Sequence, residues 1–291
     1  MIGIGLVGYG YWGPNLARNF HEAPNGALKA ICDVQLNRLK GLERRFPNAQ
    51  LTSNFDELLV RNDIEAVVIA TPTASHFPLA LAALKAGKHV WVEKPICSTS
   101  AQAKILIDEA NKRNLVLHVD HTFVYTDAIR VIRENIQSGA IGSVLYYDST
   151  RVNLGLFQKD VNVLWDLAVH DLAIMDFIIP NHCPKAISAT GVAHVPGQPI
   201  NLAYLTLLFE DNRIGHIHAN WLAPAKLRRT IIGGDSKMIV YNDLNPAEKV
   251  KIYDKGIQVT EESDIQKMLI SYRSGDIYSP RLENLEALQV E

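Results

Sequence analysis

The chain opens with a short apolar segment that ends in a glycine fingerprint, Gly8-x-Gly10-x-x-Gly13. Gly8 permits the sharp turn that a buried strand needs when it leaves a sheet. Gly10 allows a pyrophosphate to approach the backbone, and Gly13 allows the next helix to pack closely on the sheet. The free N–H groups at the start of that helix then face an anion. This segment predicts a strand–turn–helix unit that binds a dinucleotide.

A second signal follows 20 residues after Gly13, where Asp33 ends the apolar segment 28–32. A carboxylate at this spacing binds the 2′-hydroxyl of the adenosine ribose and repels the 2′-phosphate of NADP. The two signals together predict NAD as the cofactor, although glycine-rich turns also occur for packing reasons alone. Tyr11 and Trp12, inside the fingerprint, are expected to line the same cofactor site.

Apolar segments and amphipathic segments alternate along the first 120 residues. Strand-like segments lie at 2–7, 28–32, 66–70, 89–92 and 115–119. Apolar residues recur at helical spacing in the segments 14–22, 35–46, 74–86 and 99–113. This alternation predicts a doubly wound parallel sheet with helices on both faces, which is an α/β Rossmann domain over residues 1–120.

The pattern changes after residue 120, where strand follows strand. Helices are expected at 125–137 and at 163–179, the second one stopping at Pro180. Strands are expected at 144–152, 186–194, 202–209, 214–221, 227–232 and 238–241. Residues 121–291 are therefore predicted to form an α+β domain with a large, mostly antiparallel sheet.

Composition excludes several classes of function. A net charge of −2 and the absence of a basic stripe argue against a nucleic-acid partner. The three cysteines form no C-x-x-C pair, which is typical of reduced thiols rather than of a disulfide framework. No leader segment precedes the first strand, and no apolar segment is long enough to span a bilayer. We expect a soluble, cytoplasmic protein with no membrane partner.

Two candidate site segments follow predicted strands, at the edge where open α/β sheets bind their ligands. Thr71-Pro72 follows the segment 66–70, and Glu93-Lys94-Pro95 follows the segment 89–92. Lys94 would lie against an apolar wall, where an amine can exchange a proton, and a cis peptide before Pro95 would fix its direction. The pattern alone is equally compatible with a surface lysine that begins a loop.

A third candidate lies in the second domain, where Asp166 and His170 are four residues apart on a predicted helix. At this spacing the two side chains share a helix face, and the carboxylate can orient the imidazole and stabilise its charged form. Apolar neighbours would bury the pair in part. The alternative is a buried histidine with an acidic partner, or a surface ion pair that contributes little.

The other histidines give weaker signals. His118 and His121 flank Asp120, but two histidines with nearby carboxylates match known zinc spacings poorly, so no metal is predicted. His76 falls in the first turn of the predicted helix 74–86, where an ordinary position on the helix surface is expected.

Three motifs occur in this order: the glycine fingerprint, Glu93-Lys94-Pro95 and Asp166-x-x-x-His170. With them the chain resembles the Gfo/Idh/MocA oxidoreductase family over nearly its whole length. Segments 8–16 and 151–170 are most similar to the branch that oxidises the 3-hydroxyl of UDP-N-acetyl sugars. The resemblance implies that Lys94, Asp166 and His170 line one pocket between the two domains.

The resemblance also implies where the cofactor and further subunits bind. Nicotinamide-side contacts would come from Thr71, Pro72, Glu93 and His121. The open-faced sheet after Gly142 would pack subunits into a homodimer or homotetramer. Family members continue into a closing helix, of which residues 282–288 resemble the beginning.

The hypothesis is reversible, NAD-dependent hydride transfer at a sugar hydroxyl. His170, oriented by Asp166, is the expected general base, and Lys94 donates a hydrogen bond to the substrate oxygen. The reverse assignment, with Lys94 as the base, stays open.

Three residues that precede the catalytic helix are expected to contact sugar hydroxyls or a diphosphate: Arg151, Asn153 and Gln158. A surface role for Arg151 is the alternative. Three other functions also stay open. These are a dehydrogenase of a free polyol or sugar such as myo-inositol, a non-catalytic NAD(H) sensor, and an enzyme that recycles a tightly held NAD during hydrolytic or epimerising chemistry.

Overall fold

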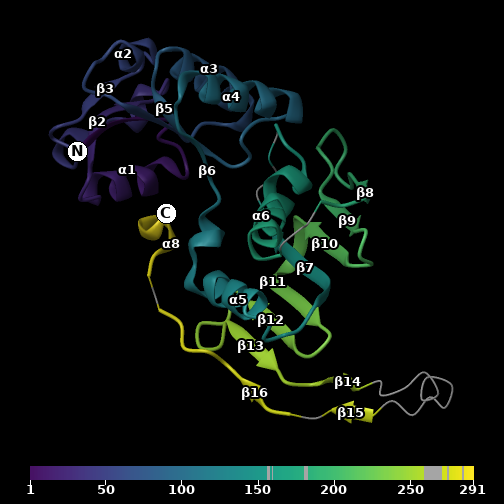
Figure 1. The fold of residues 1–291 in the computed structure, drawn as a ribbon. Coiled ribbons are helices and arrows are strands. Elements are labelled where there is room, and N and C mark those ends of the chain that lie inside the picture. Colours follow the sequence, from purple (N-terminus) through teal and green to yellow (C-terminus); the bar gives the residue numbers. More distant parts are fainter. Residues whose placement is uncertain (156–157, 159, 180–182, 259–270, 274, 284) are drawn as a thin grey trace. The chain divides into compact units, whose positions relative to one another are not determined.

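The computed structural model describes residues 1–155, 158, 160–179, 183–258, 271–273, 275–283 and 285–291. The chain divides into two compact units, Met1–His121 with Glu291 and Thr122–Val290. Figure 1 follows the chain from the first unit, in purple and blue, to the strands of the second, in teal and green. The separate roles predicted for residues 1–120 and 121–291 stay predictions.

The first unit is built on a six-stranded sheet in which every neighbouring pair is parallel. The strand order is β3-β2-β1-β4-β5-β6, so the chain moves outward from β1 in one direction and then from β4 in the other. Such a reversal leaves a crevice beyond the carboxyl ends of β1 and β4. The predicted doubly wound sheet is confirmed. Its strands are β1 (Ile2–Val7), β2 (Gly26–Cys32), β3 (Gln50–Thr52), β4 (Ala66–Ile69), β5 (His89–Glu93) and β6 (Leu117–Asp120).

Apolar side chains from the helices of this unit pack against the sheet, including Leu84 and Leu106, neither of which is exposed. The helices are α1 (Gly13–Glu22), α2 (Asp56–Leu59), α3 (His76–Lys85) and α4 (Ser100–Arg113). The prediction of a helix over residues 35–46 is wrong. Two short 3₁₀ turns, Leu36–Arg38 and Leu42–Arg44, stand there instead. Gly41 separates them with φ +82°, a left-handed conformation that interrupts a helical hydrogen-bond ladder.

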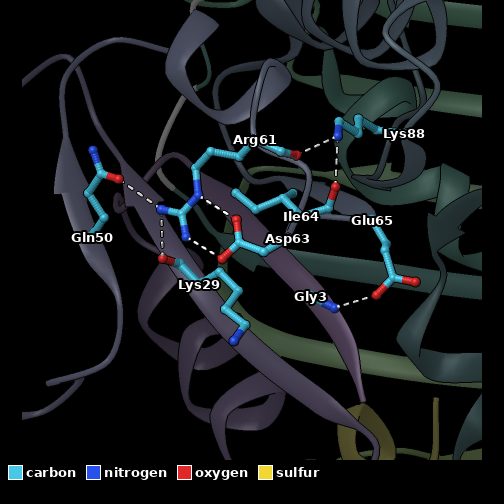
Figure 2. A network of polar contacts seen from close by, with 8 residues as sticks. All are labelled: Gly3, Lys29, Gln50, Arg61, Asp63, Ile64, Glu65 and Lys88. Atoms are coloured by element: carbon cyan, nitrogen blue, oxygen red, sulfur yellow. Dashed lines mark hydrogen bonds and ion pairs between the residues drawn. The ribbon is translucent and has the colours of Figure 1, made fainter.

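A polar network holds the loop that precedes β4, at the amino edge of this sheet (Figure 2). The buried Lys88 donates from Nζ to the carbonyl oxygens of Arg61, at 2.7 Å, and Ile64, at 2.8 Å. The guanidinium of Arg61 binds Asp63 through two hydrogen bonds of 2.8 and 2.7 Å. The loop is therefore fixed from its backbone as well as from its side chains.

Replacing Lys88 by methionine should destabilise the protein, because the carbonyls of Arg61 and Ile64 lose their donor inside the fold. We expect a loss of about 1–3 kcal/mol in the free energy of unfolding, measured by urea denaturation. Lys85→Met, at an exposed lysine near the end of α3, is the matched control and should leave stability nearly unchanged. Equal stability of the two variants would contradict a structural role for the Lys88 ammonium.

The second unit is built on an eight-stranded sheet with the order β16-β13-β12-β11-β7-β10-β9-β8. Neighbouring strands are antiparallel except for β7 and β10, which are parallel. The predicted large, mostly antiparallel sheet is confirmed. Its strands are β7 (Val144–Leu154), β8 (Ala186–Val192), β9 (Leu202–Leu208), β10 (Ile214–Asn220), β11 (Leu222–Gly234), β12 (Met238–Asn242), β13 (Val250–Tyr253) and β16 (Ile277–Tyr278). Strands β14 (Gly256–Gln258) and β15 (Ser271–Arg273) pair separately.

Helices α5 (Asp127–Gln137) and α6 (Val169–Ile178) contribute to the apolar core of the second unit. Side chains of β9 alternate, so that Leu205 and Leu207 are buried while Tyr204 and Leu208 are exposed. An exposed apolar sheet face agrees with the expected subunit contacts, which stay a prediction. The helix expected over 282–288 differs from the structure: among the described residues of this range, helix begins only at Ala287, where α8 (Ala287–Val290) starts.

The helix predicted over 163–179 has two parts. Leu164–Ala168 forms a turn of π-helix, in which the N–H of Val169 donates to the carbonyl of Leu164, and α6 follows directly. A single π turn inside a helix is often found at functional sites. The expected stop at Pro180 lies outside the described residues.

Within the described ranges, no helix has the length and hydropathy needed to cross a bilayer. The three cysteines are free thiols, with Cys32 and Cys97 buried and Cys183 exposed.

Candidate active site

The glycine fingerprint forms a tight turn between β1 and α1. Gly8 has φ +94°, and a Cβ added there would lie 2.6 Å from the carbonyl oxygen of Ala70. A Cβ on Gly13 would lie 2.3 Å from the carbonyl oxygen of Gly8. A Cβ on Gly10 would meet nothing closer than 3.7 Å, so this position has open space beside it. The turn therefore fits a dinucleotide, because two glycines close the loop and the third leaves the backbone open to a diphosphate.

Asp33, at the end of β2, organises the same loop. Its Oδ2 accepts a hydrogen bond from the backbone N–H of Tyr9 at 2.7 Å, and its Oδ1 accepts from Gln35 at 2.8 Å. Arg38, which the sequence analysis did not single out, lies with Nη1 3.3 Å from Asp33 Oδ2 and remains partly exposed. An arginine beside this carboxylate can also hold a 2′-phosphate. We therefore expect the balance between Asp33 and Arg38 to influence the choice between NAD and NADP.

Replacing Asp33 by serine should shift cofactor preference towards NADPH. The change removes the negative charge that repels the 2′-phosphate and releases Arg38 to bind it. We expect the ratio of the NADH and NADPH dissociation constants to change by about 10-fold or more, equivalent to 1.4 kcal/mol, in fluorescence titrations. The double variant Asp33→Ser/Arg38→Ala should lose the increased preference for NADPH. An unchanged ratio in the single variant would refute the role assigned to Asp33.

Two acidic side chains end neighbouring strands of the first sheet. Glu93 and Asp120 are register partners in β5 and β6. Burial, reinforced by the charge of Asp120, raises the pKa of Glu93 to about 10. The indole Nε1 of Trp12 donates to Asp120 Oδ2 at 3.3 Å, which connects the fingerprint to the end of β6. Glu93 is therefore uncharged at neutral pH.

Stability should fall as the pH rises because of Glu93. Its pKa in the folded state lies above the value of about 4.3 in an unfolded chain, so the folded state holds a proton that the unfolded state releases. The free energy of unfolding therefore decreases over the pH range from about 4.3 to about 10. Melting temperatures from pH 6 to 9 should therefore fall less steeply for Glu93→Gln, which cannot titrate. Parallel curves of melting temperature against pH for the wild type and Glu93→Gln would contradict an uncharged Glu93. Glu22→Gln, which removes an exposed carboxylate, is the control and should follow the wild-type curve.

The remaining cofactor candidates follow the same strand ends. Thr71 and Pro72 come directly after β4, and His121 comes directly after β6. Tyr11 is 90% exposed within the fingerprint. The peptide between Lys94 and Pro95 is cis, as suggested by the sequence analysis. The cofactor contacts of these residues stay predictions.

His76 differs from its expected place on a helix surface. Its side chain is 1% exposed, and its ring nitrogens face the carbonyl oxygens of Thr71 and Pro95. The helical pattern could not reveal this burial, because both partners come from other segments of the chain. Over the ranges that the structure describes, no group of three His, Cys, Asp or Glu side chains is arranged to hold a metal ion.

The candidate base lies at the junction between the π turn and α6. Asp166 is in the π turn and His170 is in the first turn of α6, both half-buried. The buried Trp221 donates from Nε1 to Asp166 Oδ2 at 3.0 Å, so the carboxylate has a fixed direction. The ring of Phe123 contacts His170 edge-on, with centroids 4.9 Å apart. No local sequence pattern points to a role for Trp221 or Phe123, although Trp221 directly follows β10.

Arg151 is buried, unlike the surface position that the alternative interpretation expected. This residue is 4% exposed, and its Nε and Nη2 donate to the two oxygens of Asp171 at 2.7 and 3.2 Å. Its guanidinium also lies 4.6 Å from the ring centroid of Phe123. Arg151 is therefore not a surface residue, and its predicted contact with a sugar or a diphosphate stays a prediction. Asp171 adjoins His170, so this buried ion pair fixes the start of α6.

The other substrate candidates are on or after β7. Asn153 is half-buried on the strand, and Gln158 is exposed beyond its end. Lys94 is half-buried at the end of β5. Lys94 and His170 belong to different units, and the convergence of their side chains on one substrate stays a prediction.

Two family descriptions match the chain. "Oxidoreductase family, NAD-binding Rossmann fold" covers residues 2–121, and "GFO/IDH/MocA C-terminal domain" covers residues 129–240. The uncharacterized oxidoreductase YdgJ of Escherichia coli (strain K12) is 30% identical over 267 residues, which is 85% of this chain and 73% of YdgJ. The chain belongs to the Gfo/Idh/MocA oxidoreductase family. It is accordingly an oxidoreductase with an NAD-binding Rossmann domain.

Two similar proteins within this Gfo/Idh/MocA set are named for nucleotide sugars. The structure of UDP-N-acetylglucosamine 3-dehydrogenase GnnA from Acidithiobacillus ferrooxidans is 25% identical, with a TM-score of 0.80 over 100% of this chain and 87% of GnnA. The dTDP-3,4-didehydro-2,6-dideoxy-alpha-D-glucose 3-reductase of Streptomyces violaceoruber is 43% identical over 125 residues, which is 43% of this chain and 36% of the reductase. Both names place the reaction at carbon 3 of an activated sugar.

Proposed function

We propose that this Gfo/Idh/MocA protein transfers a hydride between a sugar carbinol and NAD, with the 3-hydroxyl of a UDP-N-acetyl sugar as the reacting group. The observation that carries the redox role is the position of Lys94, at a strand end on the same sheet edge as the glycine fingerprint. The choice of sugar is supported by the similarity to GnnA, which is named as a UDP-N-acetylglucosamine 3-dehydrogenase. In this proposal the first unit holds the cofactor and the second holds the sugar.

Oxidation of the carbinol breaks its C–H and O–H bonds. Bound NAD would supply the acceptor for the hydride and its electron pair. The substrate oxygen must release its proton as the carbonyl forms. His170 takes that proton. Asp166, held by the indole N–H of Trp221, orients the imidazole and stabilises the positive charge that forms on it.

Lys94 acts on the substrate oxygen rather than on its proton. Negative charge builds on this oxygen as the proton leaves, and an ammonium within hydrogen-bond distance stabilises it. The neighbouring Glu93 is uncharged at neutral pH, so it leaves the positive charge of Lys94 available to the substrate.

Thermal shift with NADH present tests the substrate class. UDP-N-acetylglucosamine at 100 times its dissociation constant should stabilise the complex by about 2.7 kcal/mol, whereas myo-inositol should not raise the melting temperature. UDP alone is the control for nucleotide binding without the sugar. NADH formation from NAD with the same UDP sugar then tests turnover.

Other outcomes would overturn the proposal in distinct ways. Stabilisation by myo-inositol and not by the UDP sugar would favour a polyol dehydrogenase. Tight NADH binding, with no cofactor reduction across a panel of sugars, would favour a non-catalytic NAD(H) sensor.

A further inference from the structure

His76 is the first residue of α3, yet its imidazole lies inside the first unit with 1% exposure. Its Nδ1 lies 2.8 Å from the carbonyl oxygen of Pro95, in the loop after β5. Its Nε2 lies 2.8 Å from the carbonyl oxygen of Thr71, in the loop after β4. The ring therefore bridges the two loops that carry Lys94 and the predicted nicotinamide contacts.

The two partners determine how many protons the ring needs. A backbone carbonyl oxygen can only accept a hydrogen bond, and a neutral imidazole has one N–H donor and one acceptor nitrogen. A neutral His76 would place the lone pair of one nitrogen against a carbonyl oxygen at 2.8 Å, in a buried site. Such a facing pair of acceptors is costly, because neither group can turn to water. A ring with both nitrogens protonated donates to both carbonyls.

We propose that His76 is a buried imidazolium that donates one hydrogen bond to each loop and so positions Lys94 relative to Thr71. His76 is a positioning residue, since it holds the peptide after Lys94 and does not touch the substrate. The protonation of the ring is independent of the activity proposed above, whereas its effect on turnover rests on that activity.

The same unit already contains a cation in this role. At the opposite edge of the sheet, the buried ammonium of Lys88 donates to two backbone carbonyls at 2.7 and 2.8 Å. His76 repeats this arrangement at the carboxyl edge with a ring in place of an amine.

The surroundings of His76 contain opposing influences on its charge. The positive end of the α3 dipole disfavours a cation, and so does Lys94. Glu93, at the same edge of the sheet, is uncharged and does not oppose these effects. Burial of the ring, which is 1% exposed, also disfavours the cation. Two short charge-assisted hydrogen bonds to carbonyl oxygens oppose these costs.

Nitrogen-15 NMR of the histidine rings in the full-length protein at pH 7.5 tests the proton count directly. The His76 signals, assigned from their loss in His76→Gln, should show a proton on both ring nitrogens. His89 is an internal control, because its Nδ1 accepts from the N–H of Val116 at 2.9 Å and must therefore lack a proton. A His76 ring with one unprotonated nitrogen would overturn the proposal.

Hydrogen exchange tests the positioning role without any substrate. In His76→Gln, whose single amide nitrogen cannot reach both carbonyls, backbone exchange should accelerate at residues 71–76 and 94–97. Lys88→Met is the matched control, since it removes a buried donor to two carbonyls from the other edge. If exchange accelerated equally at both edges of the sheet in both variants, His76 would affect only the overall stability of the unit. That result would contradict its role in positioning the two loops.

Turnover provides the last readout. At a temperature where both variants are folded, His76→Gln should lower kcat by about 10-fold or more, because small displacements of a positioned group slow catalysis strongly. Lys88→Met should retain the wild-type kcat. An equal kcat in the two variants would refute the link to Lys94. A wild-type protein without turnover would refute the proposed function and leave the ring protonation and the exchange result standing.

Discussion

Replacing Lys94 by methionine is expected to lower kcat by at least ~100-fold while the dissociation constant for NADH changes by less than about threefold. Methionine keeps the length and the apolar stem of lysine but cannot donate a hydrogen bond to the substrate oxygen. A donor aimed at developing charge contributes mainly to the transition state, so its loss appears in kcat rather than in cofactor affinity. Steady-state kinetics with the UDP sugar and fluorescence titration with NADH measure the two quantities.

The control for Lys94 is Lys85→Met, which removes an exposed ammonium from the same unit. This variant should retain wild-type kcat and NADH affinity. Wild-type turnover by Lys94→Met would show that the lysine is a surface residue at the start of a loop, the alternative that the sequence left open.

The second large effect is expected from His170→Asn. Asparagine has a similar shape and retains hydrogen bonding, but it cannot take up the hydroxyl proton. General-base catalysis contributes about 10²–10⁴-fold, so kcat should fall by at least ~100-fold with little change in NADH binding. His216→Asn, at a half-buried histidine on β10, is the control and should leave kcat nearly unchanged.

A smaller loss in His170→Asn than in Lys94→Met would reverse the two assignments, with Lys94 as the base. Full activity in His170→Asn would remove His170 from the reaction. The buried pair of Arg151 and Asp171 should keep α6 in place in this variant, because it does not involve the imidazole.

Local patterns in the sequence were sufficient for most of the fold. The alternation of apolar and amphipathic segments determined the parallel sheet, because each strand carries its own signal. The helix over 35–46 was wrong because its apolar spacing is helical while Gly41 takes a left-handed conformation. The π turn before α6 was missed because one extra residue in a turn barely alters the apolar spacing.

In the candidate site, features that are close in sequence were predicted, whereas contacts between distant residues were not. The glycine fingerprint and Asp33 are close in sequence, and their spacing was informative. The ion pair of Arg151 was not predicted, because its partner, Asp171, lies 20 residues away and is brought to it only by folding. Trp221 meets Asp166 across 55 residues, so no local pattern could have paired them.

The most direct test of the proposed chemistry is a structure of the protein with NADH and UDP-N-acetylglucosamine bound together. Lys94 Nζ and a ring nitrogen of His170 should both lie within about 3 Å of the sugar 3-hydroxyl oxygen, with carbon 3 facing the nicotinamide. A complex in which either side chain points away from that oxygen would contradict the assigned roles.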